Sequence, residues 1–324
     1  MKSKKVLVTG AGGFIGSHLA ERCVQAGWRV RVFVHYHSDG RAGWLADSEL
    51  LRDMEVVAGD IRDYDAVHAA CRGVDTVFHL AALIGVPYSY VSPLAYVRTN
   101  IEGTHNVLRA AVEHAVANLL ISSTSETYGS AQYVPMDERH PPVARSPYAA
   151  SKTAADQLAL SFWHAFDLPV KIVRPFNTYG PRQSLRAIIP NVIAQLATGS
   201  RVRVGNTSPT RDFMFVEDTV AGFLAIAGCE RAVGEAVNLG TGTNTSIAEL
   251  IRLIAQIMQV DVEIVPEPAR RRHERTEVDQ LLCDNSKAKL YCAWAPCHSL
   301  AQGLARTVEW VRSNLSGATP PYVV

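Results

Sequence analysis

The chain has 324 residues, of which 48% are hydrophobic and 19% charged, and its formal net charge is +1. This is ordinary globular composition, long enough for one large or two moderate domains. The balanced charge does not favour a nucleic-acid or membrane-surface partner, and no apolar run approaches the ~20 residues of a membrane span.

The six cysteines are scattered along the chain and include no C-x-x-C pair. This spacing is typical of free thiols in a reducing compartment. Lysines near the N-terminus precede an apolar stretch, but glycines from Gly10 onward interrupt it, which does not favour a signal peptide. We therefore expect a soluble, cytoplasmic protein. The eleven histidines show no metal-ligand spacing, so the sequence predicts no metal site.

The first half of the chain alternates short β-branched runs with helical patterns of about 10–15 residues. The predicted strands are Lys5–Thr9, Arg29–Val34, Glu55–Ala58, Thr76–Leu80, Leu119–Ser122, Val170–Val173 and Ala236–Leu239. The predicted helices are Phe14–Ala26, Asp63–Cys71, Asn100–Val116 and Pro147–Phe166. The alternation predicts an α/β fold of the Rossmann type, a doubly wound parallel sheet with helices on both faces.

A glycine cluster follows the first predicted strand directly and opens the first predicted helix. Gly10, Gly13 and Gly16 form a G-x-x-G-x-x-G pattern. Glycines permit a tight turn and let backbone N–H groups approach a pyrophosphate at the helix N-terminus. In this context the pattern predicts a dinucleotide site, with Phe14 and Ile15 in the same turn.

The end of the second predicted strand leaves NAD and NADP open, with NAD as the predicted cofactor. An acid there would bind the ribose 2′-hydroxyl, but residues 32–37 contain no carboxylate. His35 and Arg41 are the candidates to face a 2′-phosphate. Asp60, followed by Ile61, is a candidate acceptor for the adenine amino group. The segment after the fourth strand suits close approach of a cofactor, and its residues are Leu80, Ala81 and Ala82.

After about Pro175 the loops lengthen and the regular alternation of strands and helices ends. Helices are predicted at Ile188–Ala197 and Ile247–Met258, with short strands at Arg201–Val204 and Asp261–Val265. We expect residues 1–175 to form the dinucleotide-binding domain, joined by a returning segment near 215–242. Residues 176–214 and 243–315 are expected to form a smaller, partly interwoven α/β lobe that binds substrate.

Two segments about twenty residues apart, 124–129 and 148–152, suggest the chemistry. In the second segment, Tyr148 and Lys152 are four residues apart and share one face of a helix. A Lys ammonium at ~4–6 Å favours phenolate over phenol, so this spacing predicts a lowered Tyr148 pKa and an acid/base group near neutral pH. In the first, Glu126 adds a carboxylate that simple alcohol oxidation does not need.

The glycine motif, Thr124, and the Tyr148 and Lys152 pair together resemble the extended short-chain dehydrogenase/reductase family that acts on nucleotide-diphosphate sugars. The resemblance runs from about Thr9 to Trp310. It implies that Tyr148 is the catalytic base, that Lys152 holds the cofactor ribose, and that Thr124 orients the sugar 4-hydroxyl. It also implies that Asn100 steadies the site, although a role as helix N-cap stays open.

Within that family, the Thr124, Ser125 and Glu126 sequence is similar to two branches. One is the 4,6-dehydratases of the GDP-mannose type, and the other is the UDP-glucuronate decarboxylases, whereas 4-epimerases usually lack this glutamate. Segments 82–90, 174–183 and 282–287 resemble dehydratases that feed legionaminic-acid-type sugars. Their substrate is an N-acetylglucosamine carried on UDP or GDP.

The predicted reaction begins by oxidising C4, which makes the C5 proton acidic. Tyr148 takes the 4-hydroxyl proton as hydride leaves C4 for the nicotinamide, Glu126 removes the C5 proton, and water leaves from C6. Hydride then returns to C6 and a proton to C5. The resemblance places Ser125 where dTDP-glucose dehydratases have an aspartate acid. Glu126 is therefore the preferred proton donor to the leaving hydroxyl.

Guanidinium groups suit a nucleotide diphosphate because they bind phosphate in a bidentate manner. The candidates are Arg182, Arg211, Arg270 and Arg272. The resemblance places Asn177 and Arg272 at the diphosphate and Arg211 near the nucleotide ribose. The family commonly has proline after that last arginine, where this chain has His273, so Arg270 competes for the role. Nothing in the sequence separates UDP from GDP.

Three alternatives remain from the sequence. A UDP-glucuronate decarboxylase would need a basic residue facing C6, for which Arg182 and Arg186 are candidates. An NDP-sugar 4-epimerase would stop at C4, and a non-catalytic cofactor-binding interaction protein would not need the intact catalytic set. The helices 100–116 and 147–166 carry apolar positions on more than one face. By resemblance they imply a homodimer built on a four-helix bundle.

Overall fold

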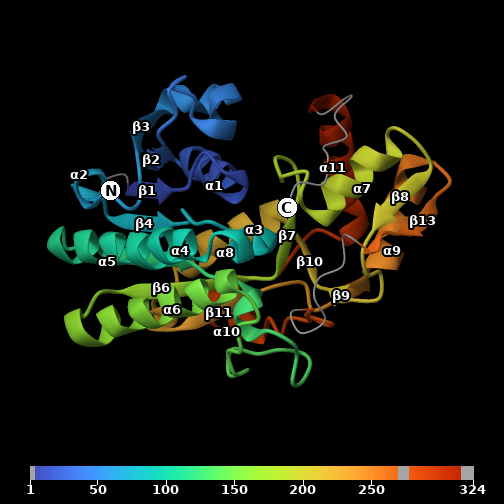
Figure 1. The fold of residues 1–324 in the computed structure, drawn as a ribbon. Coiled ribbons are helices and arrows are strands. Elements are labelled where there is room, and N and C mark those ends of the chain that lie inside the picture. The colour runs from blue at the N-terminus through green and yellow to red at the C-terminus, as the bar shows by residue number, and fades with distance from the viewer. Residues whose placement is uncertain (1–3, 269–276, 315–324) are drawn as a thin grey trace.

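The computed structural model describes residues 4–268 and 277–314. In Figure 1 a large sheet with its helices lies on one side of the molecule and a smaller group of helices and strands on the other. The short strands β7 (Asn177–Tyr179), β9 (Thr210–Arg211) and β10 (Phe213–Phe215) lie between them. Arg270 and Arg272 fall outside the described residues.

The large sheet has seven parallel strands in the order β11-β6-β5-β4-β1-β2-β3. Their bounds are β1 Lys5–Thr9, β2 Arg29–His35, β3 Met54–Gly59, β4 Thr76–His79, β5 Asn118–Ser122, β6 Val170–Pro175 and β11 Ala236–Leu239. The predicted doubly wound parallel sheet is confirmed. Because the strand order reverses between β1 and β4, ligands are expected at the carboxyl ends of these two strands.

Helices bury both faces of this sheet. On one face, α1 (Phe14–Gln25) and α8 (Val216–Ala227) share a core with alternate β1 residues, Val6 and Val8. On the other, α2 (Tyr64–Cys71), α5 (Gly103–Glu113) and α6 (Pro147–Phe166) share a core with Leu7. Burial on both faces explains why central strands such as β1 and β4 are continuous apolar runs rather than alternating ones.

The smaller part of the molecule is built from α7 (Ile188–Leu196), α9 (Ile247–Met258) and α11 (Leu300–Asn314), which pack on one another. The strands β8 (Arg201–Val204) and β13 (Glu263–Pro266) pair beside them, and β12 (Thr245–Ser246) pairs with β9. A capping box between Ser246 and Glu249 starts α9. Helix α10 (Ser286–Cys292) lies against β11 and α8.

The predicted helix 100–116 is wrong at both ends. The chain forms α3 (Val86–Val91), α4 (Pro93–Tyr96) and a π-helical turn, Val97–Glu102, before α5 begins. Asn100 lies inside the π-helical turn, so the N-cap alternative is also wrong. After α5 ends at Glu113, Ala115 adopts a φ of 48° that stops the helix.

Every helix in the described ranges is too short or too polar to cross a bilayer.

Candidate functional site

The turn after β1 is compact enough to require glycine. Gly10 has a φ of 70°, and a Cβ there would lie 2.7 Å from the backbone nitrogen of Ala81. A Cβ on Gly16 would overlap the carbonyl of Gly10. The turn therefore lies directly against the segment after β4, so the structure brings together Gly10 and the predicted residues Leu80 and Ala81. No side chain caps α1 at Gly13, which leaves the first-turn N–H groups of Phe14 and its neighbours suited to an anion.

A buried hydrogen-bond chain fixes this corner. Thr9 Oγ1 accepts from the backbone N–H groups of Leu80 and Ala81, each at 3.2 Å, so its own proton goes to Nδ1 of His79 at 2.8 Å. Nε2 of His79 then donates to Thr104 Oγ1 at 3.0 Å, and that hydroxyl donates to the carbonyl of Asn100 at 2.6 Å. Burial lowers the pKa of His79 to about 3, which agrees with a neutral ring.

The neutral state of His79 predicts a loss of stability in acid. In the unfolded chain it titrates near the ordinary pKa of 6.5, whereas in the folded protein its pKa is about 3. Between these values the unfolded state binds more protons, so the free energy of unfolding falls as pH decreases below 6.5. At about pH 5 the expected loss from this group is about 2 kcal/mol.

Urea unfolding of wild-type and His79→Gln protein at about pH 7 and about pH 5 measures this loss. Between about pH 7 and about pH 5, the free energy of unfolding of His79→Gln should fall by about 2 kcal/mol less than that of the wild type. The exposed His164 provides the matched control, since His164→Gln should follow the wild type. Equal losses in wild type and His79→Gln would mean that His79 is protonated in the folded protein.

Asp60, the predicted acceptor for the adenine amino group, is bound by Arg62. Its carboxylate accepts from the backbone nitrogen and from the guanidinium of Arg62 at 2.9 Å. These hydrogen bonds lower the pKa of Asp60 to about 2, with His35 contributing a further charge. Asp60, Arg62, Asp63, Arg98 and Glu102 line a hollow of about 660 Å³. Ile61 is buried nearby against Gly103, and Arg41 pairs with Asp47 at 3.5 Å.

Asn100 joins the segment after β4 to α6. It exchanges hydrogen bonds with the backbone of Leu83 and donates to Ser151 Oγ at 2.9 Å. Ser151 Oγ in turn donates to the carbonyl of Tyr148 at 2.7 Å. A π-helical turn often marks a functional position, and here it accommodates the side chain that fixes the first turn of α6.

The structure brings Thr124, Glu126 and Tyr148 together. Thr124 caps the short 3₁₀ helix Ser125–Tyr128 by accepting from the Glu126 N–H at 3.2 Å, and its side chain also hydrogen-bonds the hydroxyl of Tyr148. The negative charge of Glu126 acts on Tyr148.

The sequence before Tyr148 explains why it stands in the first turn of α6. Ser146 caps the helix by accepting from the Ala149 N–H at 3.1 Å, and Pro147 occupies the first helical position. Tyr148 and Lys152 therefore stand one helical turn apart at the start of α6. Ser125 is buried in the same 3₁₀ helix as Glu126.

The predicted direction of the Tyr148 pKa is wrong. Burial raises it above the ordinary value, although the Thr124 hydrogen bond opposes this. Burial also lowers the pKa of Lys152 to about 8. Both side chains leave water together, and removal from water disfavours the charged form of each. The helix spacing places the ammonium near the phenol but does not reveal this shared desolvation.

A buried ion pair between Asp156 and Arg174, near the predicted catalytic residue Lys152, was not foreseen from the sequence. Asp156 Oδ2 accepts from Ser123 at 2.7 Å and from the Arg174 guanidinium at 3.0 and 3.2 Å. Arg174 also donates to the Tyr128 hydroxyl at 3.0 Å. Asp156 is the one residue whose charge raises the pKa of Lys152. The available signal was an aspartate one turn after Lys152, within an apolar helix.

Aromatic rings adjoin the ring of Tyr148. The ring centroids of Tyr96 and Tyr148 are 6.2 Å apart in an edge-on arrangement, and the Tyr96 hydroxyl donates to the Gly85 carbonyl at 2.5 Å. Tyr88 lies on the far side of Tyr96, with 6.2 Å between ring centroids. The positive charge of Arg186 acts on Tyr96. Arg186 is exposed, so the structure puts an accessible cation near this group of tyrosines.

The predicted substrate residues have different surroundings. Asn177 Oδ1 is buried without a hydrogen-bond partner among the described residues. Arg211 is buried on β9 and donates to the Thr210 carbonyl at 2.9 Å. Arg182, at a φ of 69°, bonds both carboxylate oxygens of Glu21 on α1 at 2.9 Å. The guanidinium of Arg182 is thus already engaged by the helix that follows the glycine turn.

Comparison with known proteins covers nearly the whole chain. The profile of the family described as GDP-mannose 4,6 dehydratase matches residues 7–307. The dTDP-glucose 4,6-dehydratase of Streptomyces antibioticus is 34% identical over 315 residues, covering 95% of this chain and 92% of that protein. The UDP-N-acetyl-alpha-D-glucosaminuronate decarboxylase of Bacillus cytotoxicus is 33% identical over 320 residues, covering 95% and 98%.

Among solved structures, DesIV of Streptomyces venezuelae is similar over 96% of this chain and 97% of its own, at 30% identity and a TM-score of 0.86. That protein is a dTDP-glucose 4,6-dehydratase whose crystal structure has NAD bound.

Proposed function

The chain belongs to the GDP-mannose 4,6-dehydratase family of extended short-chain dehydrogenases/reductases, and from this premise we propose that it is an NAD(P)-dependent nucleotide-sugar 4,6-dehydratase. Relatives in the family include sugar-nucleotide dehydratases, decarboxylases and epimerases. The proposed reaction converts an NDP-hexose to its 4-keto-6-deoxy derivative. The proposed sugar is N-acetylglucosamine, carried on UDP or GDP.

One observation supports dehydration above the other reactions. Glu126 lies in the 3₁₀ helix capped by Thr124, and its charge acts on Tyr148. A carboxylate beside the base proposed to take the 4-hydroxyl proton supports removal of a proton from the neighbouring C5. Oxidation at C4 alone needs Tyr148 and Lys152 but not this carboxylate.

The glycine turn and the buried lysine fit a nicotinamide dinucleotide. Gly10 and Gly16 lie where a Cβ would overlap neighbouring backbone, so only glycines allow this tight turn, and no side chain caps α1. Lys152 is buried, yet no protein group in the described ranges accepts a hydrogen bond from its ammonium, which suits the hydroxyls of a ribose. Bound there, the nicotinamide supplies hydride acceptance from C4 and hydride return to C6.

The side chains of this chain perform the proton transfers in the proposed reaction. Tyr148 accepts the proton of the 4-hydroxyl, which the Thr124 side chain orients. Because burial disfavours the phenolate, the positive charge of Lys152 is needed to make this transfer favourable. Glu126 then takes the C5 proton and gives it to the hydroxyl that leaves C6 as water. When hydride returns to C6, a proton is added at C5, and the proton that Tyr148 took from the 4-hydroxyl balances it.

The proposed sugar rests on the resemblance of segments 82–90, 174–183 and 282–287 to dehydratases of N-acetylglucosamine nucleotides. The Bacillus cytotoxicus relative adds support, because its name specifies a UDP-linked N-acetylated sugar acid. The unpartnered Oδ1 of Asn177 and the arginine Arg211 are the proposed contacts to the nucleotide in the described residues.

Mass spectrometry of reactions with UDP- and GDP-N-acetylglucosamine tests this function. The expected product has lost the mass of one water molecule, with no net change in the cofactor. A 4-epimer of unchanged mass would contradict the dehydratase proposal and favour an epimerase. No turnover of either substrate, together with turnover of dTDP-glucose, would contradict only the proposed sugar.

A decarboxylase is the second candidate, and Arg186 favours it. This exposed guanidinium acts on Tyr96, whose ring adjoins Tyr148. A cation in this position is suited to a carboxylate at C6. Release of carbon dioxide from UDP-glucuronate or its N-acetylated analogue would establish this reaction instead.

Glu126→Gln is expected to separate oxidation from water loss. The variant keeps Tyr148 and Lys152, so reduced cofactor should still appear when substrate is added. Water loss should slow by about 10²- to 10⁴-fold, because the C5 proton no longer has its base. Cofactor absorbance follows the first step and product mass follows the second.

Ser125→Ala is the matched comparison on the same 3₁₀ helix. Ser125→Ala should catalyse elimination of water from the substrate at nearly the wild-type rate if Glu126 is both base and acid. An equally severe loss in Ser125→Ala would assign the leaving-group proton to that hydroxyl. If Glu126→Gln catalysed dehydration at the wild-type rate, the proposed mechanism would be contradicted.

We also propose a homodimer through α5 and α6, which pack side by side. Exposed apolar side chains support this, since Phe166 at the end of α6 is 56% exposed and Leu94 on α4 is 57% exposed. Light scattering at about micromolar concentration is expected to give twice the mass of the chain. A monomer under those conditions would contradict the four-helix bundle.

A further inference from the structure

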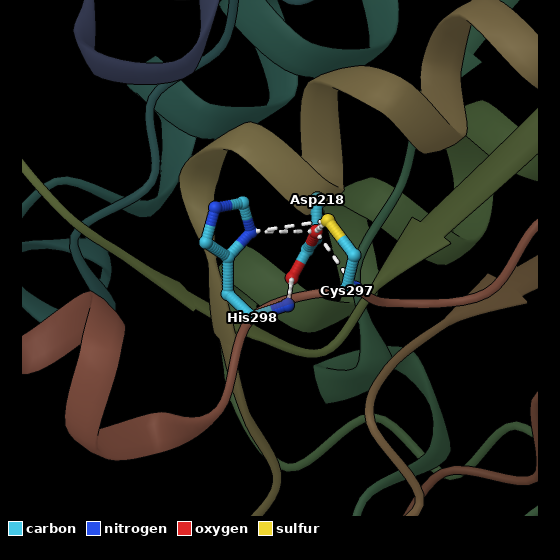
Figure 2. Close-up of side chains that lie close together, drawn as sticks. All are labelled: Asp218, Cys297 and His298. Atoms are coloured by element: carbon cyan, nitrogen blue, oxygen red, sulfur yellow. Dashed lines mark hydrogen bonds and ion pairs between the residues drawn. The ribbon is translucent and has the colours of Figure 1, made fainter.

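Three side chains with metal-ligand chemistry meet outside the proposed active site. Asp218 lies in the first turn of α8, and Cys297 and His298 lie in the segment between α10 and α11 (Figure 2). Their donor atoms all lie within 4.8 Å of one another, and within residues 4–268 and 277–314 no second group of this kind occurs. None of these elements carries a predicted catalytic residue.

We propose that Asp218, Cys297 and His298 bind a divalent cation of borderline softness, with Zn²⁺ as the best match. A carboxylate oxygen, a thiolate sulfur and an imidazole nitrogen form a donor set typical of zinc. Asp218 Oδ1 lies 3.0 Å from Cys297 Sγ and 2.9 Å from His298 Nδ1, and the sulfur and nitrogen are 3.4 Å apart.

These separations are close to those around a tetrahedral ion. With ordinary Zn–S, Zn–N and Zn–O bond lengths, tetrahedral ligand atoms are about 3.3–3.6 Å apart. Each contact between donor atoms therefore needs to lengthen by about 0.5 Å or less. Cys297 is exposed and His298 is half-buried, so rotation of their side chains can supply this. Buried Asp218 is the fixed donor, since Oδ1 and Oδ2 also accept from the backbone nitrogens of Cys297 and His298.

A second carboxylate orients the histidine as metal sites commonly require. Nε2 of His298 lies 3.4 Å from Glu217 Oε2, and Arg306 holds that carboxylate at 2.8 Å. Histidines that ligate a metal through one nitrogen usually donate the other N–H to a carboxylate. With the cation on Nδ1, the proton of His298 moves to Nε2 and faces Glu217.

The charges and protons of the site balance when Zn²⁺ binds. Without the cation, the hydrogen bond to Asp218 raises the pKa of Cys297, because a thiolate beside a carboxylate is unfavourable. The cation removes that penalty. Cys297 releases its proton to solvent, and His298 remains neutral with its proton on Nε2. Two negative ligands then match the charge of Zn²⁺.

The fourth position is left to water or to a ligand from solution. Three protein ligands are characteristic of an open zinc site rather than a closed structural one. His298 also lines a hollow of about 310 Å³ with Thr241, Thr243 and Ser299. Hydroxyl groups therefore adjoin the proposed site.

The competing explanation is that Asp218 only anchors the backbone of the segment before α11. The four hydrogen bonds from Cys297 and His298 are sufficient for that role. The two explanations differ in what happens to the exposed thiol: anchoring needs the backbone of Cys297, whereas metal binding needs its sulfur.

The experiment is titration of chelator-treated, full-length protein with Co²⁺ and with Zn²⁺. One Co²⁺ per chain should bind with a thiolate-to-cobalt charge-transfer absorption in the near ultraviolet, and one Zn²⁺ should displace it. Cys297→Ser should remove the charge-transfer band and weaken Zn²⁺ binding at least about tenfold, and Glu217→Gln should weaken it about 10- to 100-fold without removing the band.

Cys292→Ser and His164→Ala are the matched controls, since these residues lie outside the cluster, and both should bind like the wild type. Cys297 is exposed, so Cys297→Ser should retain the wild-type circular dichroism. Equal Zn²⁺ affinity in Cys297→Ser and Cys292→Ser would overturn the proposal and leave the anchoring role. Absence of the charge-transfer band at saturating Co²⁺ would overturn it as well.

Discussion

Replacing Tyr148 with phenylalanine is expected to lower kcat by about 10²- to 10⁴-fold while leaving cofactor binding nearly unchanged. The ring of Tyr148 remains packed edge-on against Tyr96, so the substitution removes the hydroxyl without emptying space. That hydroxyl is hydrogen-bonded by the Thr124 side chain, and no other group in the proposed mechanism accepts the 4-hydroxyl proton. Steady-state kinetics with the preferred sugar nucleotide and a separate cofactor titration measure the two quantities.

Tyr96→Phe is the matched control, because its ring is the neighbour of Tyr148 and its hydroxyl donates only to the Gly85 carbonyl. It should retain kcat within about tenfold, the loss reflecting one hydrogen bond that positions residues near the site. If Tyr148→Phe and Tyr96→Phe lose activity equally, the general-base role of Tyr148 is wrong.

Asp156→Asn is expected to lower the free energy of unfolding by about 3–5 kcal/mol. Arg174 is buried, and its closest charged partner is Asp156 at 3.0 Å. The substitution keeps the shape of the side chain but leaves the guanidinium without a counter-charge inside the protein. Urea unfolding at neutral pH measures the change.

Glu263→Gln provides the surface comparison. Glu263 pairs with Arg201 at 2.7 Å, but the two side chains are 59% and 70% exposed. Its removal should cost less than about 1 kcal/mol. Adding Arg174→Met to Asp156→Asn should recover part of the lost stability, because the unpaired charge is then absent. A loss in Asp156→Asn as small as in Glu263→Gln would show that water reaches Arg174.

The main sheet was predictable because most of its strands are short apolar runs. β1 and β4 are buried on both faces, whereas β3 at the edge of the sheet is largely exposed. Helices α8 and α11 had no predicted counterpart, and both contain a glycine that lowers helix propensity. Gly222 in α8 lies where a Cβ would be 2.5 Å from a methyl carbon of Leu239, and a Cβ on Gly303 in α11 would overlap the Tyr179 hydroxyl. The reason for each glycine lies in a contact with a distant element.

The candidate site was predictable where it depends on local spacing and not where it depends on burial. The interval from Tyr148 to Lys152 places both on one helix face, and the segment from Thr124 to Glu126 forms its own capped turn. Desolvation of the Tyr148 hydroxyl reverses the predicted direction of its pKa, and the pairing of Arg182 with Glu21 joins residues 161 positions apart. Neither the burial of Tyr148 nor the Arg182–Glu21 ion pair can be read from local sequence spacing.

The return of the chain to the main sheet as β11 limits how this protein can be recombined with its relatives. β11 pairs with β6 along the register from Ala236 to Leu239, so the residues between them leave the sheet and come back to it. A chimera with a single junction after Pro175 would take the outer strand from a foreign chain and force two unrelated sequences to form one sheet edge. Exchange of both predicted substrate segments, residues 176–214 and 243–315, therefore requires three junctions, placed so that β6, α8 and β11 stay from the same parent.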